Sequence, residues 1–60
     1  AFRSVVAIKN IPKGVKITDD MVWTKRPGTG IPPKDINKVI GRRSNIHINK
    51  NTLLSWDQLI

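Results

Sequence analysis

The residue best suited to recognise a ligand is an arginine near the middle of the chain. It lies in the run Lys25-Arg26-Pro27-Gly28-Thr29-Gly30. A guanidinium presents several donors in one plane, which suits carboxylate, phosphate or carbonyl oxygens. Proline biases the residue before it toward extended backbone, and the two glycines permit positive φ and close backbone approach. We therefore expect a loop that presents Arg26 as a binding group, with residues 27–30 as its support. An ordinary solvated surface arginine remains the alternative.

Few other side chains could carry chemistry. The sequence has one histidine, His47, four aspartates as its only acids, and no cysteine. A metal site or a Ser/His/Asp triad needs more convergent groups than these. We therefore predict no catalytic residue, no metal ligand and no cofactor site in this chain. The lack of cysteine fits a reducing compartment, and we expect a cytoplasmic protein.

The net charge is +7 and the pI is near 10.7. Such a charge is compatible with nucleic acid, an anionic membrane surface or a small anionic ligand. However, the lysines are scattered, only three aromatic residues are present, and no apolar run exceeds four residues. Nucleic-acid binders more often place aromatic residues among their basic ones. We expect no membrane segment and no nucleic-acid partner.

Sixty residues form one domain at most, and we treat residues 1–60 as a single unit. Residues 4–8 are β-branched and predict a strand, residues 10–14 a turn, and residues 15–17 a second short strand. Thr18 and the two acids after it predict an N-cap and a single helical turn. We expect Met21 and Val22 to point inward and Trp23 to pack against the core.

This segment recurs 37 residues later. Ile11, Lys13 and Asp20 match Ile48, Lys50 and Asp57, while Gly14 matches Asn51, another residue that tolerates the left-handed conformation. Ile17, Thr18 and Val22 likewise match Leu54, Ser55 and Leu59. Neither copy could bury an apolar face alone, so we predict that the two pack about a pseudo-twofold axis.

Between the copies, residues 31–41 predict a short helix that ends at Gly41. Its apolar residues Ile36, Val39 and Ile40 would share one face. We expect Arg42 and Arg43 to interact with the carbonyl groups at the end of this helix. Residues 44–48 predict a strand, with Ile46 and Ile48 on one face and His47 on the other, as a surface residue. The predicted fold is small and mostly β, with single helical turns.

Four segments resemble the C-terminal antifreeze-like (SAF) domain of bacterial and archaeal sialic acid synthases. They are SVVAIKNIPKGVKIT (4–18), WTKRPGTGIPP (23–33), VIGRR (39–43) and TLLSWDQLI (52–60), of which KRPGTGI is the most specific. The resemblance covers nearly the whole chain. It implies the type III antifreeze protein fold, a β-clip or pretzel-like arrangement of short strands and 3₁₀ turns.

The resemblance also implies a parent enzyme. In that family a homodimer with an N-terminal TIM barrel condenses phosphoenolpyruvate with N-acetylmannosamine, using a divalent metal, Mn or Mg, bound in the barrel. The SAF domain of one subunit closes over the partner subunit's barrel, and the arginine of the Arg-Pro-Gly motif bonds the sugar's N-acetyl group. That position is Arg26 here. The 60-residue chain would thus be a substrate-binding lid without catalytic groups of its own.

Three alternatives accompany this hypothesis. The parent could be a related legionaminic or pseudaminic acid synthase. Because the fold is shared with fish antifreeze proteins, the chain could also be a stand-alone module that binds ice. Ice binding requires a flat and largely apolar face, whereas the first turn carries Lys13, Lys16, Asp19 and Asp20. A stand-alone nucleic-acid-binding module is the third alternative.

Overall fold

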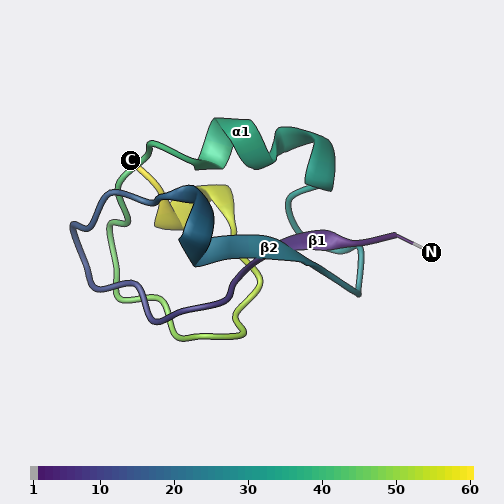
Figure 1. Ribbon diagram of the computed structural model, residues 1–60, viewed down its shortest axis with the longest axis horizontal. Coiled ribbons are helices and arrows are strands. Elements are labelled where there is room, and N and C mark those ends of the chain that lie inside the picture. Colours follow the sequence, from purple (N-terminus) through teal and green to yellow (C-terminus); the bar gives the residue numbers. More distant parts are fainter. Residues whose placement is uncertain (1) are drawn as a thin grey trace.

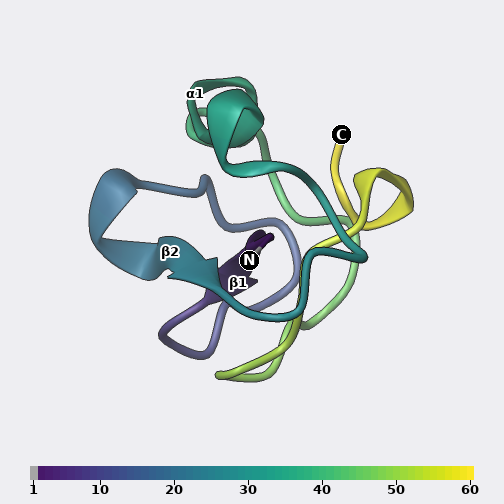
Figure 2. The same cartoon turned by 90° about the vertical axis from the view of Figure 1, so that its right-hand side faces the viewer.

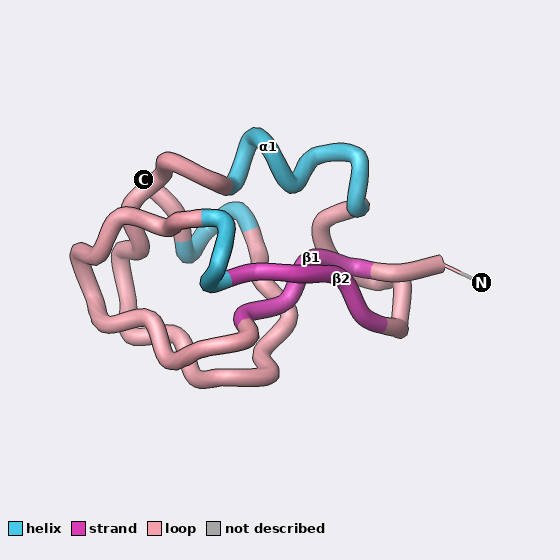
Figure 3. Tube along the Cα trace, in the orientation of Figure 1, coloured by secondary structure: helices cyan, strands magenta, loops and turns pink. Residues whose placement is uncertain are grey.

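The computed structural model describes residues 2–60, which form a small, mostly β fold (Figure 1). Short elements are separated by long irregular segments (Figure 3). Along the chain these elements are β1 (Ser4–Ala7), the 3₁₀ turn η1 (Asp19–Met21), β2 (Val22–Lys25), the 3₁₀ turn η2 (Pro33–Asp35), α1 (Ile36–Val39) and the 3₁₀ turn η3 (Trp56–Gln58). The predicted fold class is confirmed, and the first strand begins where the sequence predicts it.

The two strands form an antiparallel pair in which Ser4 lies opposite Lys25 and Ala7 opposite Val22. All four residues of β1 are buried, which makes it the central strand of the molecule. Isolated bridges join the irregular segments to one another and to β1. The fold therefore depends on single backbone pairings between distant segments rather than on a large sheet.

The predicted repeat is present, and it extends over most of the chain. Ile11 and Ile48 exchange both backbone hydrogen bonds, each of 2.8 Å, so the pseudo-twofold axis passes between them. Further pairs follow with the same offset of 37 residues. The Gly14 amide donates to Ser44 O at 2.8 Å, and the Asn51 amide donates to Ala7 O at 2.7 Å.

The same symmetry relates the segments that flank these turns. The Ile17 amide donates to Arg42 O, and the Leu54 amide donates to Val5 O. Residues 5–8 thus correspond to residues 42–45, although their side chains share little similarity. The sequence comparison found only the part of the repeat in which the side chains match.

The turn prediction is confirmed in both copies. Gly14 has φ of 86° and Asn51 has φ of 70°, so both lie in the left-handed region. Glycine and asparagine are the residues that adopt this region most readily. The two copies therefore use different residues to make the same turn.

The helical turns begin where the sequence predicts them, but Thr18 does not act as the predicted N-cap. Thr18 precedes η1 without capping a backbone amide, and its hydroxyl group donates to Asp20 Oδ1. In the second copy, Ser55 donates in the same way to Asp57 Oδ1, but there it also forms a capping box, in which the Ser55 amide donates to Gln58 Oε1 at 3.2 Å. In both bonds to aspartate the hydroxyl group donates its proton to a carboxylate, which makes the hydrogen bond charge-assisted.

The core lies on the inner side of β1 and along the pseudo-twofold axis. It consists of buried apolar side chains from both copies and from α1: Val5, Ala7, Ile11, Ile17, Val22, Ile31, Val39, Ile48, Leu54 and Leu59. Met21, Ile36 and Ile40 are partly buried against it. The inward direction predicted for Met21, Val22 and the helix face is confirmed.

The predicted helix at residues 31–41 is divided between η2 and α1. Gly41 follows with φ of 97°, as expected of a glycine that ends a helix. Arg42 Nε donates to Lys38 O at 2.9 Å, which confirms its predicted interaction with the end of the helix. For Arg43 the prediction is wrong, because its guanidinium donates to Gly14 O at 3.1 Å.

Residues 15–17 and 44–48 are not strands. Within them, Lys16, Ser44 and Ile48 make single bridges only. The chain bends after Ser44, where the backbone and side chain of Asn45 donate to residues 57–58. Because this bend interrupts the alternation, Ile46 is half exposed instead of sharing a buried face with Ile48. His47 is exposed, as predicted for a surface residue.

The prediction for Trp23 is also wrong. This side chain is 61% exposed, while Val22 before it is buried. Neighbouring residues of a strand point to opposite faces, so only one of the two can face the core. The smaller Val22 faces it, and Trp23 points outward over Val6, its partner in the register.

Candidate binding loop

The segment after β2 forms a tight loop at one end of the long axis of the molecule. In Figure 1 this loop lies at the right, near the N-terminal end, while the C-terminus lies at the far left. Figure 2 faces that end, and the loop there crosses in front of β1 on its way to α1. The Arg26–Pro27 peptide bond within it is cis.

A buried serine holds the two sides of this loop together. Ser4 is fully buried, and its hydroxyl group donates to Pro27 O at 2.6 Å and accepts from the Gly30 amide at 2.9 Å. One hydroxyl group thus fixes both ends of residues 27–30. The sequence alone does not reveal this role of Ser4, because a single serine at the start of a strand gives no indication that its hydroxyl group faces a loop more than twenty residues away.

The two loop glycines allow close packing rather than unusual backbone angles. Within residues 2–60, only Gly14 and Gly41 are glycines with positive φ, so that part of the prediction for Gly28 and Gly30 is wrong. A Cβ atom on Gly28 would lie 2.2 Å from Phe2 Cβ. One on Gly30 would lie 3.3 Å from Ser4 Cβ. Both glycines therefore let the loop lie directly on the N-terminal segment.

Arg26 itself is exposed. It makes no hydrogen bond or ion pair with any residue among 2–60, whereas both neighbouring cations are engaged. Lys25 Nζ donates to Asn51 Oδ1 at 3.1 Å, and the Arg3 guanidinium donates to Thr24 Oγ1 and Thr24 O. The loop is thus fixed by its backbone, and the guanidinium of Arg26 is available to a ligand.

Next to the loop lies an open hollow of about 270 Å³. It is lined by Thr29, Gly30, Ile31, Pro32, Leu54, Ser55 and Trp56. The guanidinium carbon of Arg42 lies 5.4 Å from the centre of the Trp56 ring, in a cation–π contact. The second half of the loop therefore forms one wall of an apolar depression, while the first half carries Arg26.

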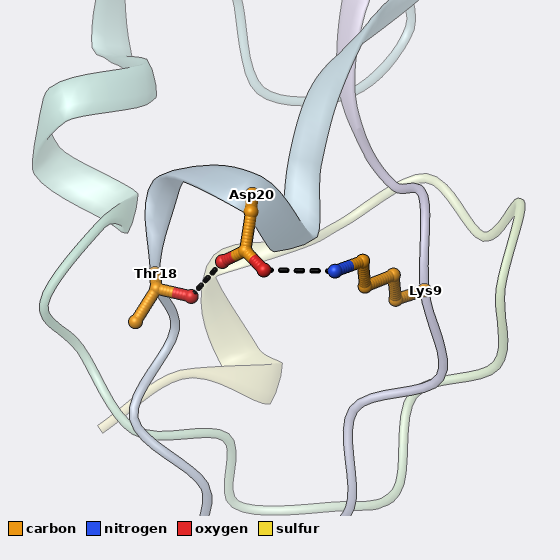
Figure 4. A network of polar contacts seen from close by, with 3 residues as sticks. All are labelled: Lys9, Thr18 and Asp20. Carbon is orange, nitrogen blue, oxygen red and sulfur yellow. Dashed lines mark hydrogen bonds and ion pairs between the residues drawn. The ribbon is translucent and has the colours of Figure 1, made fainter.

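Two of the aspartates are engaged in ion pairs with lysines outside the loop. Within the described part of the chain there are two ion pairs, Lys9–Asp20 at 2.8 Å and Lys38–Asp35 at 3.4 Å. Figure 4 shows Asp20 between Lys9 and Thr18. The ammonium group of Lys9, followed by the hydroxyl group of Thr18, lowers the pKa of Asp20 below its usual 3.8. Neither pair neutralises Arg3, Lys25 or Arg26, so the loop is a site of positive charge.

Neither a metal-binding group nor a membrane-spanning helix is present among the described residues. Residues 2–60 contain no group of three or more His, Cys, Asp or Glu side chains that could hold a metal ion. None of the helices in that range has the length and apolar character that crossing a membrane requires. The arrangement supports recognition of an oxygen-bearing ligand by Arg26.

Comparisons with known proteins identify relatives over nearly the whole chain. The SAF domain family matches residues 2–60. The chain is 32% identical over 95% of its length to N,N'-diacetyllegionaminic acid synthase of Legionella pneumophila. It is 33% identical, again over 95% of its length, to pseudaminic acid synthase of Helicobacter pylori. The matched regions are 16% and 17% of those two proteins, so the chain spans less than a fifth of their length.

The fold has a solved counterpart. An antifreeze protein like domain from the human N-acetylneuraminic acid phosphate synthase gene, whose solution structure is known, superposes with a TM-score of 0.91. It shares 29% sequence identity, and the match covers 95% of this chain and 73% of that one. The antifreeze-like fold expected from the sequence is thereby confirmed.

Proposed function

The chain belongs to the SAF domain family, and from this premise we propose that it is the amino-sugar-binding lid of a nonulosonic acid synthase. Such an enzyme condenses phosphoenolpyruvate with an N-acyl amino sugar. The chain would supply no catalytic group, because its acids and its histidine do not converge. Its contribution would be to bind and orient the sugar and to exclude water from the site.

The observation that carries this proposal is the state of Arg26. Its side chain is exposed and has no partner among residues 2–60, yet its loop is fixed by Ser4 and packed on Phe2. A fixed backbone lowers the entropy lost when the guanidinium binds a ligand. The planar fork would donate to the carbonyl oxygen of the sugar's N-acyl group, in a charge-assisted hydrogen bond.

The remaining parts of the reaction would belong to the rest of the parent protein. We propose that a TIM barrel supplies the phosphoenolpyruvate site and a bound Mn or Mg ion. We also propose that the lid covers the barrel of the partner subunit in a domain-swapped homodimer in the cytoplasm. Support comes from the two synthases, of which the matched region is only a small part.

The sugar we propose is of the N-acetylmannosamine type. Two of the relatives are legionaminic and pseudaminic acid synthases, whose sugars are the alternatives. All these substrates would present an acyl carbonyl group to Arg26. The loop residues alone therefore support the class of substrate rather than one member of it.

The test is sugar kinetics of Arg26→Ala in the full-length protein. Loss of a hydrogen bond to a charged group costs about 1.5–3 kcal/mol, so kcat/KM for the amino sugar should fall about 10- to 100-fold. The KM for phosphoenolpyruvate should stay unchanged. Arg26→Lys should recover only part of the loss, because one ammonium group replaces a planar fork.

Lys13→Ala is the matched control, because it removes one exposed cation from a turn outside the loop. Its kinetics should equal those of the wild type. If Arg26→Ala affected both substrates equally, or neither, the role of Arg26 would be refuted.

The structure gives no support to ice binding by the first turn. Lys13, Lys16, Asp19 and Asp20 of that segment are all exposed. These side chains keep their charged ends in water and so prevent a flat apolar contact with ice. A thermal hysteresis measurement on the 60-residue chain should give no activity above that of an unrelated basic protein.

A further inference from the structure

The pseudo-twofold axis relates two outer faces that have the same backbone and different chemistry. On one face Val6 is paired with Trp23 and bridged to Leu53. At the equivalent positions of the other copy, Arg43 is bridged to Lys16 and accepts a hydrogen bond from the Ile60 amide. We call these the Trp23 face (Val6, Trp23 and Leu53) and the Lys16 face (Lys16, Arg43 and Ile60).

The Trp23 face is apolar, although it does not belong to the core. Val6 is 1% exposed but lies outside the core cluster, so the side chains of its own outer face cover it. Trp23 is 61% exposed and Leu53 is partly exposed. At the same backbone positions, the Lys16 face carries two long hydrated cations. The fold therefore does not require apolar residues at the positions of Val6 and Leu53, and their presence beside the exposed Trp23 needs another reason.

The position of the Trp23 face suggests that reason. Trp23 lies on β2, the strand that leads directly into the loop with Arg26, and β2 lies at the edge of the molecule in Figure 2. A partner that meets Arg26 would thus be close to Trp23 as well. Lys25 lies two residues after Trp23 on the same strand, and Asp20, in the turn directly before β2, is paired with Lys9.

We propose that the Trp23 face is the surface by which this domain docks on the rest of its own synthase, against an apolar patch. This proposal rests on the proposed function, because it assumes that the parent is such a synthase. The rest of the synthase is the partner we propose, because more than four fifths of each of the two related synthases lies outside the matched region. Trp23 would fill the centre of the interface.

The first test is hydroxyl-radical footprinting of the 60-residue chain and of the full-length protein, with oxidation at Trp23 measured by mass spectrometry. We expect Trp23 to be oxidised several-fold more slowly in the full-length protein. Ile60 is the matched control, because it occupies the equivalent position and is 72% exposed, and its rate should stay unchanged. Equal rates at Trp23 in both proteins would overturn the proposal.

The second test compares Trp23→Ser with Ile60→Ser in the full-length protein. Truncation of a central interface tryptophan typically weakens an interface about 30-fold. Trp23→Ser should therefore raise the oxidation rate of Leu53 to that of the 60-residue chain, and Ile60→Ser should not. If both variants left Leu53 protected, Trp23 would not be the anchor and the proposal would fail.

These readouts do not depend on activity, so they separate this inference from the proposed function. Protection of Trp23 in a full-length protein that turns over no amino sugar would support the docking surface and refute the synthase. Protection that appears in the 60-residue chain as its concentration rises would instead show that a second copy covers the face, which would overturn the proposal.

Discussion

Two buried serines show how a single hydroxyl group can serve either function or stability. Ser4 and Ser44 are both fully buried, and each donates to the carbonyl oxygen of a proline, Pro27 at 2.6 Å and Pro12 at 2.8 Å. Only Ser4 also accepts from the loop, through the Gly30 amide. The two residues therefore form a natural pair for separating an effect on the loop from an effect on the fold.

Ser4→Ala should lower the free energy of unfolding by about 1–3 kcal/mol, because it leaves Pro27 O and the Gly30 amide without their partner. Urea unfolding of the 60-residue chain measures this loss. In the full-length protein the same change should raise the KM for the amino sugar, because the loop that carries Arg26 loosens. Ser44→Ala should destabilise the domain without changing that KM. Equal KM values for the two variants would show that the Ser4 hydroxyl group does not position the loop.

At Asp20 we expect stability to depend on acid pH. Its pKa is lowered in the folded state by Lys9 and Thr18. This stabilisation is present above the usual value of 3.8 and is lost as the pH falls through the lower folded-state pKa. Unfolding free energies of the wild type and Asp20→Asn should therefore differ near neutral pH and converge in acid. Asp19→Asn, whose parent residue makes no side-chain bond within residues 2–60, should leave the free energy of unfolding near neutral pH close to that of the wild type.

At the scale of elements, the turns at Gly14 and Asn51 have equivalent backbone conformations. Both residues lie in the left-handed region, and a Cβ atom at Gly14 would meet no atom within 4 Å. Backbone strain, rather than space, should thus decide which residues are tolerated there.

Gly14→Ala should destabilise the chain by about 1–2 kcal/mol, because alanine is strained at positive φ. Gly14→Asn should cost less, since asparagine already forms the same turn in the second copy. Thermal unfolding of the two variants gives the comparison. Equal destabilisation by alanine and asparagine would contradict the equivalence of the two turns.

The elements also show what the sequence could and could not predict. The strand at residues 4–8, the turns and the short helix follow from local residue preferences, and the structure bears them out. The prediction that Trp23 packs against the core is wrong, because the sequence does not show which face of its strand an aromatic residue occupies until the strand register is known. Residues 44–48 alternate like a strand, but the hydrogen bonds of Asn45 to the C-terminal turn, which no local pattern reveals, bend them.

For the candidate site, the prediction of a fixed and exposed arginine loop came from Pro27 and the two glycines. What holds the loop could not be predicted, because Ser4 and Phe2 reach it from the far end of the sequence. The local sequence thus indicated that Arg26 is exposed on a loop, whereas the contacts that hold this loop come from residues distant in the sequence.

At the scale of the whole molecule, the pseudo-twofold axis passes between Ile11 and Ile48, both of which are buried. Ile11→Val and Ile48→Val should each cost about 0.5–1.5 kcal/mol, by similar amounts, because the two sites are equivalent. The double variant should depart from additivity, since the residues are direct neighbours. Ile46→Val, at a half-exposed position, should be nearly neutral. Denaturant unfolding of the four variants tests all three expectations.

The reciprocal pairing of Ile11 with Ile48 also constrains how the chain can reach its native state. Backbone bonds across the axis, such as those of Gly14 to Ser44 and of Asn51 to Ala7, tie the two halves together, so we expect neither half to be stable alone. The central bonds can close only after the chain between residues 11 and 48 has formed a loop, and the entropy of that closure must be overcome first. A chain built in this way should fold more slowly than a helical bundle of equal length, and it should unfold in a single step.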